Sequence, residues 1–191
     1  MNMLMVEEAY LPLTLTVPGI TDAQFMKLCQ QYENFRVEYT AEGVLLVMPP
    51  TDSGTSKKNS WITYQLTGWA LSTHGELPTE SSGGFLLPSG ARRSPDAAWI
   101  SNGRLSHKPN CPEFVIELIS PFDSLKKTRA KMLEWIENGA LLAWMINPRK
   151  KSVTIYRPGR EPETLTGVDR VRGEGPVEGF VLDLERVWQG A

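Results

Sequence analysis

Apolar residues recur along the chain at two different spacings, and the change from one to the other predicts the order of helices and strands. Residues 53–73 contain no proline, and their apolar side chains recur every three or four residues, which is typical of one helix face. A second such helix is expected over about 124–138, where Asn138-Gly139 forms a C-terminal stop. A shorter first helix, capped by Thr21-Asp22, is expected to run to about Tyr32.

Between the helices the apolar residues alternate or form short runs, as they do in strands. Residues 35–40 alternate, turn at Glu42-Gly43 and return over 44–48, which predicts a hairpin. Further strands, and a short helix at the end of the tail that begins at residue 179, complete the pattern. The expected strands are 85–87, 96–100, 113–119, 141–146 and 153–156.

A strand–helix–strand unit in the middle of this order favours an α/β (mixed α+β) fold, in which a central mixed sheet is flanked by helices. We expect one domain over residues 1–191, with a helical or extended arm at about 1–33. The chain has 191 residues, 41% of them hydrophobic and 22% charged, which is ordinary for one globular domain.

The charge and cysteine content narrow the function. A net charge of −2 means that the surface as a whole does not attract nucleic acid, so any such contact needs a local basic patch. Cys29 and Cys111 stand alone, which argues against a zinc or redox centre and fits a reducing cytoplasm. Two histidines, His74 and His107, are too few for a histidine-rich metal site.

No membrane contact is expected from the sequence. Residues 1–18 lack the early Lys or Arg of a signal peptide, and no apolar run approaches the roughly 20 residues of a membrane span. We therefore expect a cytoplasmic protein. Its oligomeric state stays open at this stage, a homo-oligomer included.

Two carboxylates stand out because each interrupts or begins an apolar strand. Glu117 lies inside a run that is apolar on both faces, where an ionised carboxylate costs several kcal/mol unless it is paired, protonated or bound to a cation. Asp96 follows Pro95 at the start of another apolar strand. Two carboxylates at strand ends repel each other, and a shared proton or a divalent cation relieves the repulsion. Because the ligands are oxygens without nearby His or Cys, the expected cation is Mg²⁺ or Mn²⁺.

A basic helix start follows Glu117 directly. It carries four cationic side chains within six residues (Lys126, Lys127, Arg129 and Lys131). A cation with nearby lysines is the chemistry that phosphodiester hydrolysis requires, because positive charge stabilises the phosphate and holds the attacking water.

These residues resemble the PD-(D/E)XK nuclease superfamily and, within it, the Uma-type restriction endonucleases. The resemblance implies a restriction-endonuclease-like core, DNA as substrate, Asp96 and Glu117 as metal ligands, and Glu38 as a third acidic member. It covers nearly the whole chain from Phe35 onward. The matching phrases are Val47-Met-Pro-Pro50, Arg93-Ser-Pro-Asp-Ala-Ala98, Pro112-Glu-Phe-Val-Ile-Glu-Leu-Ile-Ser-Pro121, Lys131-Met-Leu-Glu-Trp135, residues 139–148, and Gly179-Phe-Val-Leu-Asp-Leu184.

The chain departs from the family pattern at two places. The superfamily lysine stands two residues after the second acidic residue, where this chain has Ile119. The Uma-type branch carries a lysine on the following helix instead, which Lys131 matches; Lys127, one turn earlier, is the reserve candidate. Many members also have a histidine near the start of the long helix, and residues 53–59 contain none, so nucleic-acid contacts near Lys57 and Lys58 stay unassigned.

Simpler interpretations exist for each candidate. Asp96 and Glu117 fit a structural pair satisfied by Arg92, Arg93 or backbone amides. Glu38 shares a strand face with Arg36 and Thr40, which also fits a solvated hairpin face, and the basic run fits a solvated helix face.

Three functions compete at this stage. A Mg²⁺-dependent endonuclease leads, and a catalytically silent nucleic-acid or protein-binding module with the same fold is the alternative. An arginine bridge in the site would favour the silent module. A glycosidase with two carboxylates is disfavoured because no aromatic-rich sugar platform lies near either acid.

Overall fold

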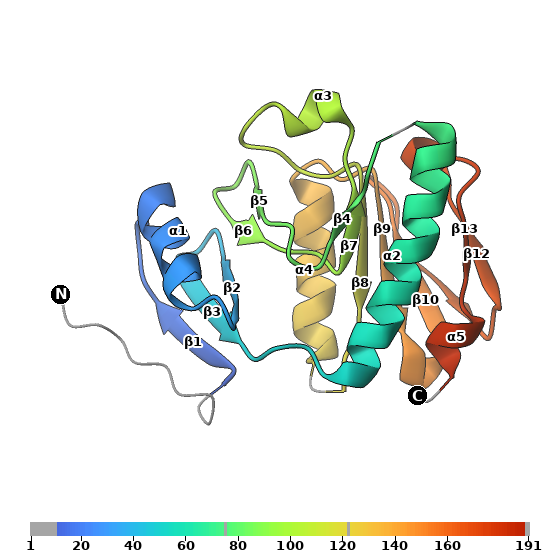
Figure 1. Ribbon diagram of the computed structural model, residues 1–191, viewed down its shortest axis with the longest axis horizontal. Helices are drawn as coiled ribbons and strands as arrows, with labels where there is room; N and C mark the ends of the chain where they lie inside the picture. Colours follow the sequence, from blue (N-terminus) through green and yellow to red (C-terminus); the bar gives the residue numbers. More distant parts are fainter. Residues whose placement is uncertain (1–10, 75, 122, 190–191) are drawn as a thin grey trace.

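The computed structural model describes residues 11–74, 76–121 and 123–189, and it is built around a mixed six-stranded sheet (Figure 1). The strand order is β11-β10-β9-β8-β7-β4. Strands β8 and β9 are parallel and the other pairs are antiparallel, so the predicted mixed sheet is confirmed. The strands are β4 (Thr79–Glu80), β7 (Ala97–Trp99), β8 (Phe114–Leu118), β9 (Leu142–Asn147), β10 (Ser152–Tyr156) and β11 (Glu163–Thr166).

Helix α4 (Leu125–Glu137) connects the two parallel strands, as a parallel pair requires. Ser124 caps its start by accepting a hydrogen bond from the backbone N–H of Lys127. Gly139, at φ 110°, ends the helix where the sequence predicted a stop. The helix packs Met132 and Trp135 against one face of the sheet, next to Val115 of β8.

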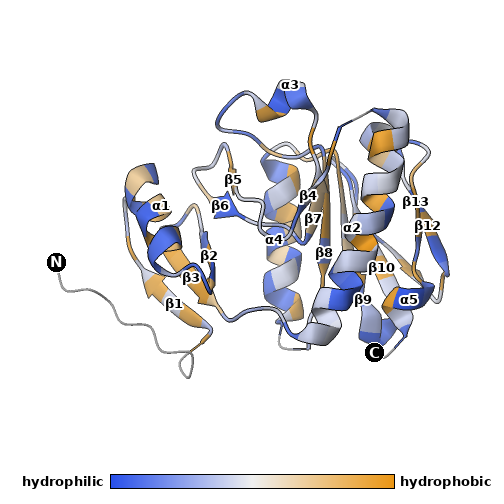
Figure 2. Ribbon diagram, in the orientation of Figure 1, coloured by the Kyte–Doolittle hydropathy of each residue, from blue (hydrophilic) through white to orange (hydrophobic). Residues whose placement is uncertain are grey.

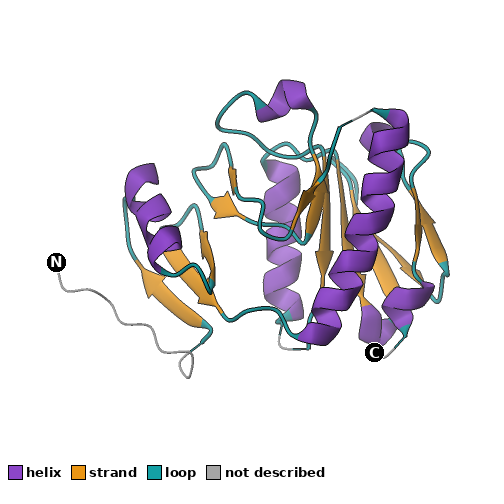
Figure 3. Ribbon diagram, in the orientation of Figure 1, coloured by secondary structure: helices purple, strands orange, loops and turns teal. Residues whose placement is uncertain are grey.

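The opposite face of the sheet is covered by α2 (Ser53–Thr73), which was predicted with the same bounds. Its buried residues Ile62, Leu66 and Ala70 pack against Phe114 and Ile116 of β8. The ribbon of β12 (Arg170–Arg172) and β13 (Val181–Asp183) and the short helix α5 (Glu185–Trp188) complete this layer (Figure 3). The central strands are accordingly buried from both sides and largely hydrophobic (Figure 2).

A second, five-stranded sheet has the order β1-β3-β2-β6-β5. The predicted hairpin forms its middle, and α1 packs on it through Phe25. Strand β1 pairs with β3 and was not expected, so the part of the supposed N-terminal arm that is described here packs into the sheet; residues 1–10 lie outside the described residues. The elements are β1 (Leu13–Thr16), α1 (Asp22–Gln31), β2 (Arg36–Tyr39), β3 (Val44–Met48), β5 (Phe85–Leu86) and β6 (Arg92–Arg93).

The chain crosses from the small sheet to the large one between β6 and β7. Residues 94–96 form this crossing, so they lie beside β2 on one side and β8 on the other. The remaining short elements lie outside this region. They are α3 (Asn102–Leu105), η2 (Pro148–Lys150) and η3 (Gly175–Val177).

Candidate active site

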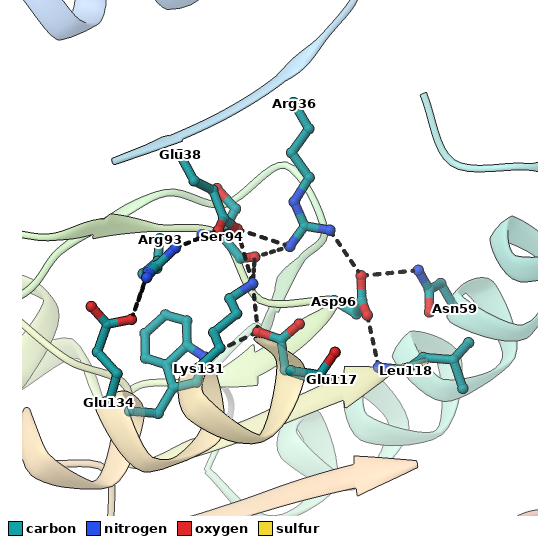
Figure 4. Close-up of polar contacts among 12 residues, drawn as sticks. Arg36, Glu38, Asn59, Arg93, Ser94, Asp96, Glu117, Leu118, Lys131 and Glu134 are labelled. Atoms are coloured by element: carbon teal, nitrogen blue, oxygen red, sulfur yellow. Dashed lines mark hydrogen bonds and ion pairs between the residues drawn. The ribbon is translucent and has the colours of Figure 1, made fainter. Parts of the chain in front are cut away.

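The four predicted site residues meet at the crossing between the two sheets (Figure 4). Glu38 comes from β2, Asp96 stands just before β7, Glu117 lies on β8 and Lys131 on α4. The three carboxylate residues are only 2%, 6% and 5% exposed, respectively. Carboxylates at this depth require partners, because burial without them costs several kcal/mol each.

The side of the sheet that Glu117 faces follows from strand alternation. Val115 and Ile119 pack on the α4 side, and Glu117 between them points the same way. In the β7–β8 pair Ala97 stands opposite Ile116, so the same register continued by one residue places Asp96 opposite Glu117. Opposed residues of an antiparallel pair have Cβ atoms about 5 Å apart.

Lys131 brings its ammonium to this point from α4. Its Nζ lies 2.8 Å from Glu117 Oε1 and 2.9 Å from Glu38 Oε1, and it donates to the backbone carbonyl of Ser94 at 3.0 Å. One helical turn later Trp135 Nε1 donates to the same Glu117 oxygen at 3.0 Å. The two side chains hold Glu117 from one helix face.

The other members of the basic run do not reach the site. Lys126, Lys127 and Arg129 are exposed on α4, which matches the solvated helix face considered above for them. Lys131 differs because it flanks the apolar face of α4 that Met132 and Trp135 form. Its methylenes therefore lie along the core while the charge points inward. The contact with Glu117 is direct; among the described residues no direct contact joins Lys131 and Asp96.

Glu38 is the most heavily paired carboxylate of the cluster. Besides Lys131 it pairs with Arg36 at 3.2 Å and with Arg93 at 3.1 Å, and it accepts a hydrogen bond from the backbone N–H of Ser94. Burial alone opposes its ionisation, but the charges of Lys131, Arg36 and Arg93 outweigh burial and lower the pKa of Glu38 to about 2. The interpretation of Glu38 as part of a solvated hairpin face is therefore wrong.

Asp96 has three partners from three elements. Arg36 Nη1 lies 3.2 Å from Asp96 Oδ1, and Asn59 Nδ2 on α2 donates to the same oxygen at 3.4 Å. The backbone N–H of Leu118 donates to Oδ2 at 2.7 Å. The Arg36 guanidinium also donates to the carbonyl of Ser94, so it bridges Asp96, Glu38 and the crossing segment.

The ionised cluster carries one negative charge in excess, because three cations face four carboxylates. Its members are Arg36, Arg93, Lys131, Glu38, Asp96, Glu117 and Glu134. Burial raises the pKa of the Glu117 carboxyl; Lys131 opposes this effect, and the charge of Asp96 adds to it. Glu117 is therefore the carboxylate on which a proton or a further cation relieves most repulsion.

The oxygen atoms available around Glu117 fit a small divalent cation. Among the described residues no partner contacts Glu117 Oε2, and Asn59 Oδ1, beside Asp96, is buried without a hydrogen-bond partner. All of these possible ligand atoms are oxygens, which Mg²⁺ and Mn²⁺ prefer. The described residues contain no group of three or more His, Cys, Asp or Glu suited to a metal. Mg²⁺ commonly uses only one or two carboxylates together with water and substrate phosphate, so the two carboxylates suffice.

Several partners were not assigned to the site from the sequence. Arg36 and Glu38 are two residues apart on β2, so the sequence places both on one strand face. It does not indicate which residues that face contacts. Asn59 stands three residues before Ile62 at helical spacing, which is a buried position for a polar residue. Trp135 is fully buried in the core, and its Nε1 contact with Glu117 adds a polar role.

The mixed sheet with helices on both faces agrees with the restriction-endonuclease-like core that the sequence resemblance implied. The model of the Uma2 family, described as "Putative restriction endonuclease", matches residues 22–185. The chain belongs to this family, as its sequence resemblance indicated.

A solved structure is similar over most of the chain. It is titled as a "putative nuclease belonging to DUF820" from Anabaena variabilis ATCC 29413; it shares 20% sequence identity, and the match has a TM-score of 0.68. The match covers 89% of this chain and 98% of that one, and at this identity it supports the fold alone. No curated protein matches the chain. Among the described residues no helix is long and apolar enough to cross a membrane.

Proposed function

We propose that the protein is a Mg²⁺-dependent (or Mn²⁺-dependent) endonuclease that hydrolyses phosphodiester bonds of DNA. The observation that carries this proposal is the Lys131 ammonium, 2.8 Å from Glu117 in a buried cluster that also holds Asp96. An ammonium beside two carboxylates is the set of groups needed for metal-assisted phosphodiester hydrolysis. Membership of the Uma2 family supports the same class of reaction.

Each residue has a role in this proposal. Asp96 and Glu117 hold the cation, which supplies positive charge for the phosphate and for the attacking water. Lys131 places a fixed positive charge beside the reacting phosphate and stabilises the negative charge that builds up there. Glu38 acts through Lys131 and Arg36, since it holds both cations at the crossing segment. It is thus a positioning residue.

One observation favours the silent module as a second candidate. The Arg36 guanidinium bridges Asp96 and Glu38, which satisfies Asp96 without a metal. The Arg36 guanidinium can take the place of a metal permanently, or it can move away from Asp96 when substrate binds. Binding and cleavage assays distinguish the two cases.

The test measures cleavage and metal binding on the same preparations. Supercoiled plasmid and circular single-stranded DNA are incubated with Mg²⁺ or Mn²⁺, or with EDTA, and Mn²⁺ binding is measured by isothermal titration calorimetry. We expect metal-dependent nicking and Mn²⁺ binding, both lost in Asp96→Asn and Glu117→Gln. Lys126→Ala, an exposed lysine on the same helix as Lys131, is the matched control and keeps both. Absence of both cleavage and Mn²⁺ binding in the unchanged protein would refute the nuclease and leave the silent module as the candidate.

The free thiols of Cys29 and Cys111 support a cytoplasmic location for this enzyme, because reduced cysteines persist there. Burial raises the pKa of both thiols, so neither is activated as a thiolate.

A further inference from the structure

A groove lies between the N-terminal half of α2 and the short helix α5, which run side by side in Figure 1. Its volume is about 870 Å³. The catalytic cluster uses the opposite side of α2, where Asn59 points to Asp96. The groove is thus separate from the carboxylates but shares a helix with them.

Aromatic side chains form one wall of the groove. Trp61 and Tyr64 stack with their ring centroids 5.6 Å apart and an interplanar angle of 22°. Trp61 is fixed, since its Nε1 donates to the carbonyl of Asp183, and the Arg186 guanidinium lies 4.6 Å from its ring centroid. Tyr64 is 69% exposed, so solvent reaches the ring face that turns away from Trp61.

The charge of the groove is positive, although the net charge of the whole chain is −2. Lys57, Lys58 and Arg186 line it together with one acid, Glu185. One exposed ring standing alone on a surface would need no explanation, but Tyr64 does not stand alone. Here it is stacked on a second ring and surrounded by cations, which is the combination that binds single strands of nucleic acid.

We infer that this groove binds an unpaired nucleic-acid strand, with a base stacked on Tyr64 and phosphates held by Lys57 and Lys58. A single strand is favoured over a duplex because the faces of its bases are accessible, whereas those in a duplex are covered by neighbouring pairs. The inference rests on the proposed nuclease function, for which it names the substrate class and a binding surface apart from the carboxylates.

The experiment measures binding without cleavage. Fluorescence anisotropy of 5′-fluorescein-labelled dT₁₂ is followed in EDTA at several salt concentrations, with a labelled 12-base-pair duplex in parallel. Tyr64→Ala is expected to weaken dT₁₂ binding by about tenfold, as the loss of one base–aromatic stack does. Tyr64→Phe keeps the ring and is expected to bind within twofold of the unchanged protein. The duplex is expected to bind more weakly than dT₁₂ to the unchanged protein.

The salt dependence tests the phosphate contacts. Lys57→Ala is expected to lower the slope of log K against log salt by about 0.7, the amount for one phosphate contact to a single strand. Lys27→Ala, an exposed lysine of α1 on the other sheet, removes the same charge and is expected to leave the slope unchanged. Lys57→Ala also tests the groove if Tyr64→Ala fails to fold.

Three results overturn the inference: equal binding of dT₁₂ by Tyr64→Ala, equal binding of the duplex, or competition by a poly-glutamate peptide as strong as that by unlabelled dT₁₂. The last result would assign the groove to an acidic protein segment. Binding that follows these expectations without any metal-dependent cleavage would leave the groove standing and refute the nuclease. Metal-dependent cleavage together with unchanged dT₁₂ binding in Tyr64→Ala and Lys57→Ala would refute the groove and leave the nuclease standing.

Discussion

Replacing Glu38 with glutamine removes one charge from the centre of the buried cluster and nearly preserves the size of the side chain. Glu38 is paired with Lys131, Arg36 and Arg93, and these charges hold its pKa at about 2 against an ordinary 4.5. At 1.36 kcal/mol per pH unit, this difference corresponds to about 3 kcal/mol of folding free energy. Glu38 is 2% exposed, so solvent screens these pairs only weakly.

The pH dependence identifies the source of this energy. A carboxylate whose pKa is lower in the folded state stabilises the fold above its ordinary pKa and loses that contribution as pH falls through the folded-state pKa. The difference in unfolding free energy between the unchanged protein and Glu38→Gln is therefore expected to be about 3 kcal/mol at pH 7. It should shrink as pH falls from about 4.5 towards about 2.

Urea unfolding followed by circular dichroism at pH 7, 5, 4 and 3, in EDTA, measures this difference. Glu161→Gln is the matched control: Glu161 is exposed, and its loss is expected to change the unfolding free energy by less than about 0.5 kcal/mol. A difference below about 1 kcal/mol for Glu38→Gln at pH 7, or one that is the same at pH 7 and pH 3, would refute the reasoning from buried ion pairs.

Three further predictions concern the rest of the cluster. Lys131→Ala is expected to lose about 10²-fold or more in cleavage rate, because it removes one preorganised positive charge, while Lys126→Ala stays near the unchanged rate; equal rates would exclude Lys131 from the chemistry. Trp135→Phe removes the N–H that donates to Glu117 and is expected to cost about 1–3 kcal/mol of unfolding free energy by urea titration; no loss would show that water replaces the donor. Arg36→Gln is expected to tighten Mn²⁺ binding in calorimetry, because it removes a positive charge from beside the carboxylates; unchanged or weaker binding would contradict competition between Arg36 and the metal.

The sequence was most informative where local signals were strong. Helix α2 and the β8–α4–β9 unit were predicted closely, because each has a long apolar periodicity or a run between clear stop signals. Strand β5 was expected at 85–87, whereas β6, with two residues, and β1, at the edge beside β3, were not expected. Such strands depend on their pairing partners, which local sequence does not specify.

The candidate site shows the same difference between residues that the sequence indicated and contacts that it did not. Glu117 was identified because a carboxylate in a two-sided apolar run needs a partner, and Lys131 because it matches the lysine that the Uma-type branch carries on the following helix. The bridge from Arg36 to Asp96 spans 60 residues of chain and the contact from Asn59 spans 37. Both contacts exist only because the two sheets and α2 meet at the crossing segment, so no local pattern contains them.

The charge balance of the cluster indicates how an arginine bridge and a metal site can occupy the same place. A divalent cation would change the net charge of the cluster from −1 to +1, and neutrality would return if one resident cation withdrew from the carboxylates. Arg36 can do so at least cost: its side chain is 23% exposed against 14% for Lys131 and 9% for Arg93. Its Nε is buried without a partner, so rotation towards solvent also satisfies a donor that is now unpaired. Asp96 and Glu117 would hold the cation in the proposed reaction, and Arg36 would turn from Asp96 towards solvent, where its guanidinium could donate hydrogen bonds to a phosphate.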